Sequence, residues 1–263
     1  MSITRLLIVA GSDSGGGAGI QADIKTATAF GVYAMTAITA VTVQNTLGVS
    51  GWQPVDRDVV KGQIEACLSD IGADALKTGM LGDAAMVATV ADALRGQVAP
   101  LVLDPVMVAK GGAKLLADEA VNAIRTKLLP LAALVTPNLP ECEALIGFAP
   151  STDEEARQAA RKFRELGARH VLFKGGHAPG AVVRDVLADG ESGELLVMEA
   201  PRIETRHTHG TGCTLASAIA SSLAQKRPLE DAVRRAHAYV QQAIRTAPGL
   251  GHGHGPLNHF VRP

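Results

Sequence analysis

Short apolar runs alternate with longer amphipathic segments along the whole chain. The runs end at glycine, proline or polar residues, as expected for strands buried on both faces of a parallel sheet. We predict strands at residues 6–10, 34–43, 74–76, 101–103, 134–135 and 170–173, helices at 20–30, 56–71, 83–94, 118–128, 153–166, from 211 onward and 229–244, and a hairpin over 181–187 and 194–198. This order predicts a single domain over residues 1–263, with an α/β fold of three layers (α/β/α) around a central, mostly parallel sheet.

Composition narrows the function classes. The 263 residues carry a formal net charge of −1 and only 3% aromatic side chains, which argues against nucleic-acid and anionic-membrane binding. We see no signal peptide and no apolar run long enough for a membrane helix. Cys67, Cys142 and Cys213 are odd in number and far apart, so no disulfide framework is expected. We therefore expect a cytoplasmic protein.

The segment Gly210-Thr211-Gly212-Cys213 comes directly before a run of small and apolar residues. Two glycines allow a close backbone approach to a ligand, and a helix beginning near Thr211 would direct free amides and a positive dipole at an anion such as phosphate. Cys213 would lie in the first turn, where the same field favours a thiolate. A glycine turn before an ordinary helix, with a buried cysteine, is an equally simple interpretation.

Polar residues follow several of the predicted strands, at the edge where open α/β sheets bind ligands. They are Gln44, which could bond a heteroaromatic ring edge, Asp104, Asn138 with Glu141, and Lys174. Asn138 and Glu141 suit either a hydrated Mg²⁺ or a capped helix start, and both can hold together. Lys174 suits a nucleotide phosphate. Asp104 and Gln44 could equally be loop residues with structural hydrogen bonds.

Residues 11–19 form a second glycine-rich segment, which leads into a helix carrying Asp23. It matches the dinucleotide-binding fingerprint only loosely, and the acidic residue expected about 20 positions later is missing. No P-loop motif is present. We expect the loop to close over a small substrate, with Asp23 directed toward it. Near the C-terminus, His252 and His254 have metal-like spacing, but a mobile tail is the simpler expectation.

Taken together, these segments give the chain a resemblance to the ribokinase-like superfamily, and within it to the hydroxymethylpyrimidine/phosphomethylpyrimidine kinases of the thiamine pathway. The resemblance covers essentially the whole chain. It is most specific in residues 10–23, 41–46 and 208–213, where no motif position is broken.

The resemblance implies a bifunctional kinase that phosphorylates an aminopyrimidine alcohol to its monophosphate and then to the diphosphate. It implies ATP as co-substrate, Mg²⁺, room for a monovalent cation, and a homodimer. The implied site residues are Gly11, Asp23, Gln44 and Met80 for the pyrimidine, Lys174 and the amides of Gly210, Thr211, Gly212 and Cys213 for phosphates, and Asp104 and Glu141 for Mg²⁺. Most of the superfamily has Asp where this chain has Cys213, so the resemblance implies Cys213 as general base.

Three alternatives stay open. A pyridoxal kinase of the same superfamily also accepts a small heteroaromatic ring with a hydroxymethyl arm. A cysteine hydrolase could pair Cys213 with His207 or His209, although a histidine on the same short loop is badly placed as an oriented base. A binding protein with an inactive kinase fold is disfavoured, because every reactive position holds a competent residue.

Overall fold

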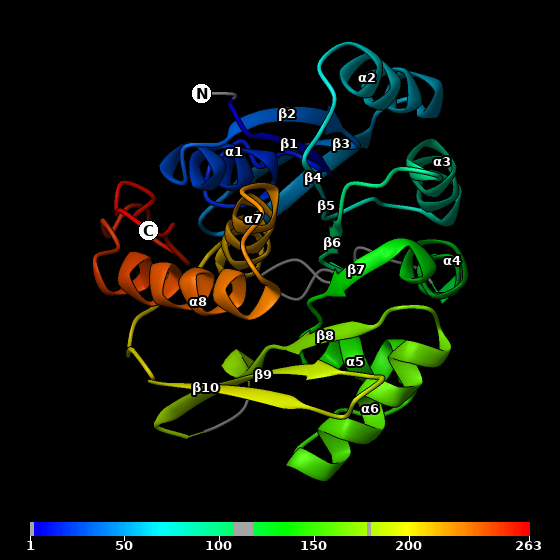
Figure 1. Cartoon of the computed structure of the whole chain (residues 1–263). Helices are drawn as coiled ribbons and strands as arrows, with labels where there is room; N and C mark the ends of the chain where they lie inside the picture. Colours follow the sequence, from blue (N-terminus) through cyan, green and yellow to red (C-terminus); the bar gives the residue numbers. More distant parts are fainter. Residues whose placement is uncertain (1–2, 108–117, 178–179) are drawn as a thin grey trace.

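Within the part of the chain that the structure describes, eight strands form the central sheet, in the spatial order β10-β9-β8-β7-β6-β5-β1-β2 (Figure 1). In this computed structural model, which describes residues 3–107, 118–177 and 180–263, the strands from β2 to β8 in that order run parallel and β9 is antiparallel to both neighbours. Their bounds are β1 Arg5–Ala10, β2 Tyr33–Ile38, β5 Ala75–Thr78, β6 Leu101–Leu103, β7 Ala132–Val135, β8 His170–Phe173, β9 Val182–Asp189 and β10 Leu195–Pro201. The predicted mostly parallel sheet with its hairpin is confirmed.

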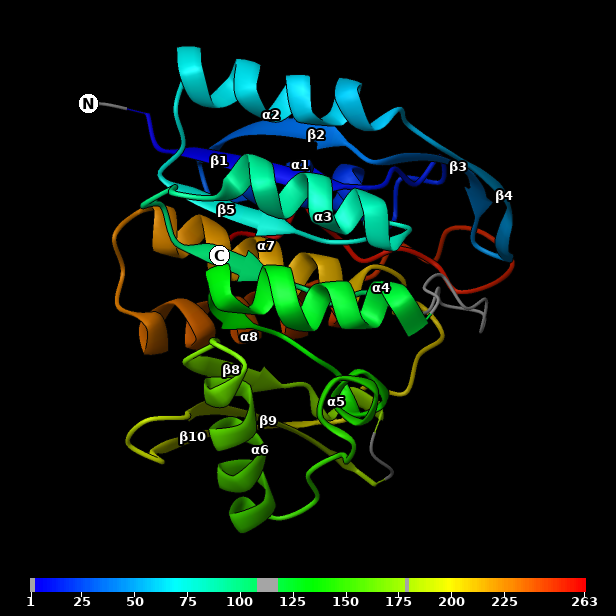
Figure 2. The same ribbon diagram turned by 90° about the vertical axis from the view of Figure 1, so that its right-hand side faces the viewer.

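Helices cover both faces of this sheet (Figure 2). Successive side chains of β1 point to opposite faces, so Leu7 packs with α2 to α6 in one core, and Leu6 with α1, α7 and α8 in the other. The bounds are α1 Gly19–Ala29, α2 Arg57–Asp70, α3 Ala84–Leu94, α4 Asp118–Ala123, α5 Leu139–Ile146, α6 Asp153–Glu165, α7 Thr211–Ala224 and α8 Leu229–Arg245. The three-layer architecture is confirmed. Among the described helices, none combines the length and the apolarity that crossing a bilayer requires.

The predicted long strand over 34–43 is wrong, because the chain leaves the sheet in its middle. At Thr39 the backbone amide donates to Ala10 and the hydroxyl to the Met80 carbonyl. Beyond this point β3 (Ala40–Asn45) pairs with β4 (Gly48–Pro54) in a separate antiparallel hairpin, and Val41 and Val43 are exposed. Solvent-facing valines made the segment resemble one buried strand.

Most predicted helix starts are confirmed by their caps. Asp56 and Asp83 accept hydrogen bonds from first-turn amides of α2 and α3. Asn138 and Glu141 form a complete capping box at the start of α5. The segment predicted as one helix over 118–128 is α4 followed by a π-helical turn at Ile124–Leu128.

The C-terminal tail is docked on the fold, so the expectation of a mobile tail is wrong. The amides of Gly253 and His254 donate to the Thr46 side chain and carbonyl in the β3–β4 turn. The Gly255 carbonyl accepts from the His209 amide at 3.1 Å. The tail therefore joins the hairpin to the loop before α7, and no metal cluster forms there among the described residues.

Candidate active site

A cavity of about 1100 Å³ lies at the carboxyl ends of the parallel strands. Residues at or just beyond these strand ends form its wall: Gly11 after β1, Lys77 and Met80 around the end of β5, Asp104 after β6, Asn138 after β7 and Lys174 after β8. Open parallel sheets bind ligands at this edge, because the loops there converge. The strand-end residues that the sequence singles out are thus brought together in one site.

The first turn of α7 closes one side of the cavity. The helix begins at Thr211, as predicted, and its N-cap Gly210 has a left-handed backbone with φ of +83°. A Cβ on Gly210 would lie 1.8 Å from the Gly17 carbonyl oxygen, so the two glycine loops meet backbone to backbone. First-turn amides have no partner within their own helix, and Gly210, Thr211 and Gly212 line the cavity. This end of α7 can hold a phosphate.

Cys213 lies in the first turn of α7 and lines the same cavity, but its thiol is not activated as the sequence predicts. Burial raises the pKa of Cys213 to about 11. The Lys77 ammonium and a hydrogen bond from the Gly19 amide lower this pKa, while the carboxylates of Asp23 and Asp104 raise it. The helix N-terminus therefore does not outweigh burial, and the thiol is neutral at pH 7 before substrates bind.

Lys174 lies next to the two carboxylates that the family resemblance assigns to Mg²⁺. Its Nζ lies 2.8 Å from Asp104 Oδ1 and 3.7 Å from Glu141 Oε2. Burial alone would lower the pKa of Lys174, but the two carboxylates raise it, so the ammonium stays charged. Thr136 donates to Asp104 Oδ1 at 3.2 Å, whereas Asp104 Oδ2 accepts no hydrogen bond from the described side chains. Burial raises the pKa of Glu141, whose Oε2 also accepts from the Asn138 amide.

The Asp104 and Glu141 pair fits a hydrated magnesium ion by its chemistry. Both groups offer oxygen ligands, and Mg²⁺ is commonly held by one or two carboxylates with retained waters and substrate phosphates. Asp104 Oδ2 lies at the α7 end of the cavity, where a Cβ on Gly212 would be 3.6 Å from it. An ion at this position would lie next to the phosphate-binding turn.

Asp23 does not reach the cavity, which corrects its predicted contact with the pyrimidine. The side chain is fully buried, and its Oδ2 lies 2.8 Å from Lys77 Nζ while Oδ1 accepts from the Ser217 hydroxyl at 2.6 Å. Burial raises the pKa of Asp23, and Lys77 and Ser217 oppose this effect. Lys77 is the member of the pair that lines the cavity, and Asp23 raises its pKa. Asp23 therefore acts on the site through Lys77.

The turn after Lys174 is held in place by a buried carboxylate. Asp185 Oδ1 on β9 accepts from the Gly175 amide at 2.8 Å, and its Oδ2 lies 3.8 Å from His237 Nε2. Burial raises the pKa of Asp185, and the Gly175 amide and His237 oppose this effect. These contacts fix the backbone from which Lys174 reaches its two carboxylates.

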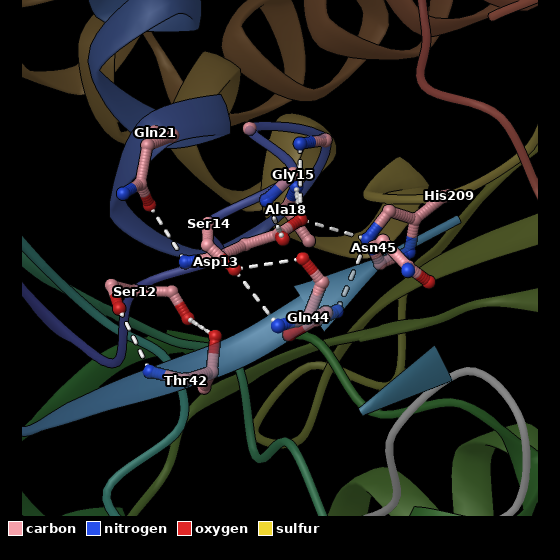
Figure 3. A network of polar contacts seen from close by, with 12 residues as sticks. Ser12, Asp13, Ser14, Gly15, Ala18, Gln21, Thr42, Gln44, Asn45 and His209 are labelled. Atoms are coloured by element: carbon pink, nitrogen blue, oxygen red, sulfur yellow. Dashed lines mark hydrogen bonds and ion pairs between the residues drawn. The ribbon is translucent and has the colours of Figure 1, made fainter. Parts of the chain in front are cut away.

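The glycine-rich loop and β3 form the opposite wall (Figure 3). Two serines join them: the Ser12 Oγ accepts from the Thr42 amide at 3.1 Å, and the Ser14 hydroxyl donates to the Gln44 carbonyl at 2.7 Å. Gln44 lines the cavity, and its side-chain amide lies 3.2 Å from His209 Nε2. The predicted ring-binding residues Gly11, Gln44 and Met80 thus share this part of the cavity, and their contacts with a ring stay predictions.

Sequence reasoning missed Lys77, Asp13 and the role of His209. Lys77 lies in a strand whose four residues are all buried, so a lysine directly after the apolar pair Ala75-Leu76 was the available signal. His209 Nε2 lies 2.9 Å from Asp13 Oδ2, which directs the imidazole into the glycine-rich loop. The hydrolase alternative needs an imidazole oriented on Cys213, and the contacts of His209 do not provide one.

A mostly parallel sheet with flanking helices, whose strand ends bring a lysine, two acidic groups and a helix N-terminus to one cavity, has the fold of the ribokinase-like kinases. Residues 13–258 match the family described as phosphomethylpyrimidine kinase. A hydroxymethylpyrimidine/phosphomethylpyrimidine kinase of Haemophilus influenzae is 46% identical over 99% of this chain and 98% of its own length. The chain therefore belongs to the phosphomethylpyrimidine kinase family.

One further relative is a longer protein, and another is a solved structure with the same fold. A thiamine biosynthesis bifunctional protein of Geobacter sulfurreducens is 51% identical over 97% of this chain, which spans 52% of that longer protein. The crystal structure of a Bacillus subtilis pyridoxal kinase in complex with ADP superimposes with a TM-score of 0.89 at 38% identity, covering 98% of both chains. The fold is thus shared with a nucleotide-bound kinase of a different ring substrate.

Proposed function

We propose that this chain transfers the γ-phosphate of ATP to the hydroxymethyl group of 4-amino-5-hydroxymethyl-2-methylpyrimidine, and then a second phosphate to the resulting monophosphate. The observation that carries this proposal is the single cavity in which Gln44, Lys174, Cys213 and the first turn of α7 meet, in a chain of this family. The nucleotide occupies the Lys174 side of the cavity, and the ring occupies the wall formed by the glycine-rich loop.

Each transfer forms a bond between the substrate oxygen and the γ-phosphorus and breaks the bond from that phosphorus to the β-γ bridging oxygen, releasing ADP. The amides of α7 and the Lys174 ammonium stabilise the negative charge on the transferred group, which supplies most of the rate in a loose transition state. Mg²⁺ held by Asp104 and Glu141 through water would supply further charge neutralisation. In the first transfer, the alcohol proton passes to the Sγ of Cys213 in its thiolate form, which becomes the neutral thiol.

A thiol with a raised pKa is compatible with this role, because the alcohol loses its proton late in the reaction. Thiolate is then a minor form at neutral pH, and the Lys77 ammonium and the Gly19 amide are the groups that favour it. A general base contributes about 10²–10⁴-fold to a rate. We expect Cys213→Ala to lower kcat by about this factor while the dissociation constant of the pyrimidine, measured by calorimetry, changes little. Near-normal turnover in this variant would contradict the base assignment.

The second transfer needs space for a phosphate already on the substrate. The glycine-rich loop supports this part of the proposal, since Gly11, Ala18 and Gly19 of this loop line the cavity and carry little or no side chain. We further infer that residues 1–263 act as one kinase domain, because the site uses residues from β1 through α7.

We also propose a cytoplasmic location, because the reaction uses ATP. Replacing K⁺ by Na⁺ in the kinase assay tests whether the protein requires a monovalent cation.

A homodimer is part of the proposal. Support comes from the outer face of the β3–β4 hairpin, where Val41 and Val43 are exposed side by side and Leu47 is exposed at the turn. Apolar side chains gathered on one face are typical of surfaces that bind a partner. Sedimentation equilibrium of the protein, with Val41→Lys as the disrupting variant, tests this part independently of activity.

The alternative substrate is pyridoxal, because the fold is shared with a pyridoxal kinase. The test is ADP release by the purified protein with Mg-ATP and each ring substrate in turn. We expect kcat/KM for the aminopyrimidine alcohol to exceed that for pyridoxal by at least about tenfold, the discrimination that a few ring contacts provide. A higher kcat/KM for pyridoxal would overturn the substrate assignment and leave the fold unchanged.

A further inference from the structure

Asp13 holds the glycine-rich loop through its carboxylate (Figure 3). Its Oδ1 accepts from the Gly15 amide at 2.8 Å, and its Oδ2 accepts from the Gly17 and Ala18 amides at 3.0 and 2.8 Å. Burial alone would raise the pKa of Asp13, but His209 and the backbone donors lower it. A carboxylate surrounded by donors in this way is ionised, and an ionised carboxylate only accepts hydrogen bonds.

His209 must therefore carry a hydrogen on Nε2. This nitrogen lies 2.9 Å from Asp13 Oδ2, and the side chain is buried. A neutral imidazole has one donor and one acceptor nitrogen, and only the form protonated on Nε2 can bond to an ionised carboxylate. The charged imidazolium also donates from Nε2, so the conclusion holds for either charge state.

The hydrogen on His209 Nε2 determines the orientation of the Gln44 side-chain amide. One atom of that amide lies 3.2 Å from His209 Nε2. If that atom were the NH2 nitrogen, two hydrogen-bond donors would face each other. A half-turn of the amide about the Cγ–Cδ bond places Oε1 there instead, and Oε1 can accept from the imidazole N–H. The Nε2–H is then shared between Asp13 and Gln44. Gln44 lines the cavity, and no described residue forms a hydrogen bond with the amide atom that points away from His209.

We propose that Asp13 and His209 orient the Gln44 amide so that its NH2 group points to the ring substrate. The inference rests on the proposed function, because it assigns a contact to the ring that this cavity binds. It makes Asp13 and His209 positioning residues, and it selects heteroaromatic rings with a lone-pair acceptor at the edge facing Gln44. An aminopyrimidine provides such an acceptor in its ring nitrogens.

The backbone of His209 is fixed independently of its side chain. Its amide donates to the Gly255 carbonyl of the docked tail at 3.1 Å, and the next residue begins the turn that caps α7. A change of the imidazole alone therefore leaves the phosphate-binding end of α7 in place. Ring binding should respond to such a change, and nucleotide binding should not.

The first experiment is calorimetric binding of 4-amino-5-hydroxymethyl-2-methylpyrimidine without ATP, paired with the KM for ATP. In His209→Gln the amide nitrogen reaches the position of imidazole Nε2 and can donate to both partners, so binding stays within about threefold of wild type. In His209→Asn the side chain is one methylene shorter, so its NH2 group does not reach the position of imidazole Nε2. We expect the dissociation constant of the ring to rise about tenfold, the loss of roughly one hydrogen bond, with the KM for ATP unchanged. Equal binding by the Asn and Gln variants would overturn the inference.

Gln44→Glu tests the direction of the amide. A glutamate keeps the acceptor facing His209 but has no hydrogen to donate to a ring nitrogen, so we expect it to bind the ring as weakly as Gln44→Ala. Wild-type affinity in Gln44→Glu would overturn the inference, because the proposed donor would then not be used.

A measurement on the wild-type protein covers the case in which the variants do not fold. Long-range ¹H–¹⁵N correlation spectra distinguish the two nitrogens of His209, and we expect Nε2 to be protonated. An Nε2 that carries no hydrogen would overturn the orientation argument. This result does not depend on the substrate, whereas failure of the wild-type protein to bind or phosphorylate the pyrimidine would contradict the proposed function instead.

Discussion

Removing one partner of the buried pair of Asp23 and Lys77 should cost more stability than breaking an ion pair on the surface. The two side chains are fully buried, with Lys77 Nζ 2.8 Å from Asp23 Oδ2. Asp23→Asn keeps the size and the hydrogen bond from Ser217 but leaves an ammonium in the core without its counter-charge. Removing one partner of a buried pair costs about 3–5 kcal/mol, because the remaining charge stays desolvated.

Urea denaturation followed by circular dichroism measures this loss. With a slope of about 3 kcal/mol per molar urea, the midpoint of Asp23→Asn should fall by about 1 to 1.7 M. The matched control is Asp92→Asn, which breaks the Arg95–Asp92 pair, also 2.8 Å long but with both side chains more than 60% exposed. We expect about 0.5 kcal/mol or less for this control, since solvent screens an exposed pair.

A double variant separates the cost of the unpaired charge from the effect of changing the side chains. The double variant Asp23→Asn with Lys77→Met removes both charges, so it should recover most of the stability that the single Asn variant loses. A midpoint for Asp23→Asn that falls no further than that for Asp92→Asn would contradict a large cost of leaving Lys77 unpaired. It would mean that Lys77 gives up its proton without a large free-energy cost.

Two further predictions concern the phosphate-binding turn and the base. Gly210→Ala should lower the urea midpoint and raise the KM for ATP, because its Cβ would lie 1.8 Å from the Gly17 carbonyl oxygen. The control is Gly96→Ala, which has a similar φ of +81° and nothing within 4 Å of its Cβ, so it should cost only about 1–2 kcal/mol and leave the KM for ATP unchanged. Equal effects of the two variants would contradict the importance of the close contact. If the Cys213 thiolate is the base, its pKa of about 11 predicts that kcat rises about tenfold per pH unit from pH 7 to 9, because the ionised fraction does. A flat profile over this range would contradict that role.

The arrangement of the site was largely predictable, because it depends on strand ends. Parallel strands bring residues that follow them to one edge of the sheet, so Asp104, Glu141 and Lys174 could be placed together without knowing any distance. The capped start of α5 and the glycine turn before α7 were predictable for a similar reason, since each is determined by a few neighbouring residues.

Tertiary surroundings determined what the sequence could not reveal. The helix N-terminus next to Cys213 predicts a lowered pKa, but burial, which depends on segments far along the chain, raises it. Asp23 pairs with Lys77, 54 residues away, and this contact has no local signal. The β3–β4 hairpin was missed because Val41 and Val43 face solvent, and an apolar run does not by itself show which side is covered.

In the proposed function, one cavity performs two successive phosphoryl transfers. Time-resolved ³¹P NMR of the purified protein with Mg-ATP and 4-amino-5-hydroxymethyl-2-methylpyrimidine tests it directly, because monoester and diphosphate groups give separate signals. We predict a monoester signal that rises first and then gives way to a pair of diphosphate signals as ATP is consumed. A monoester that persists while ATP remains would show that the cavity does not perform the second transfer.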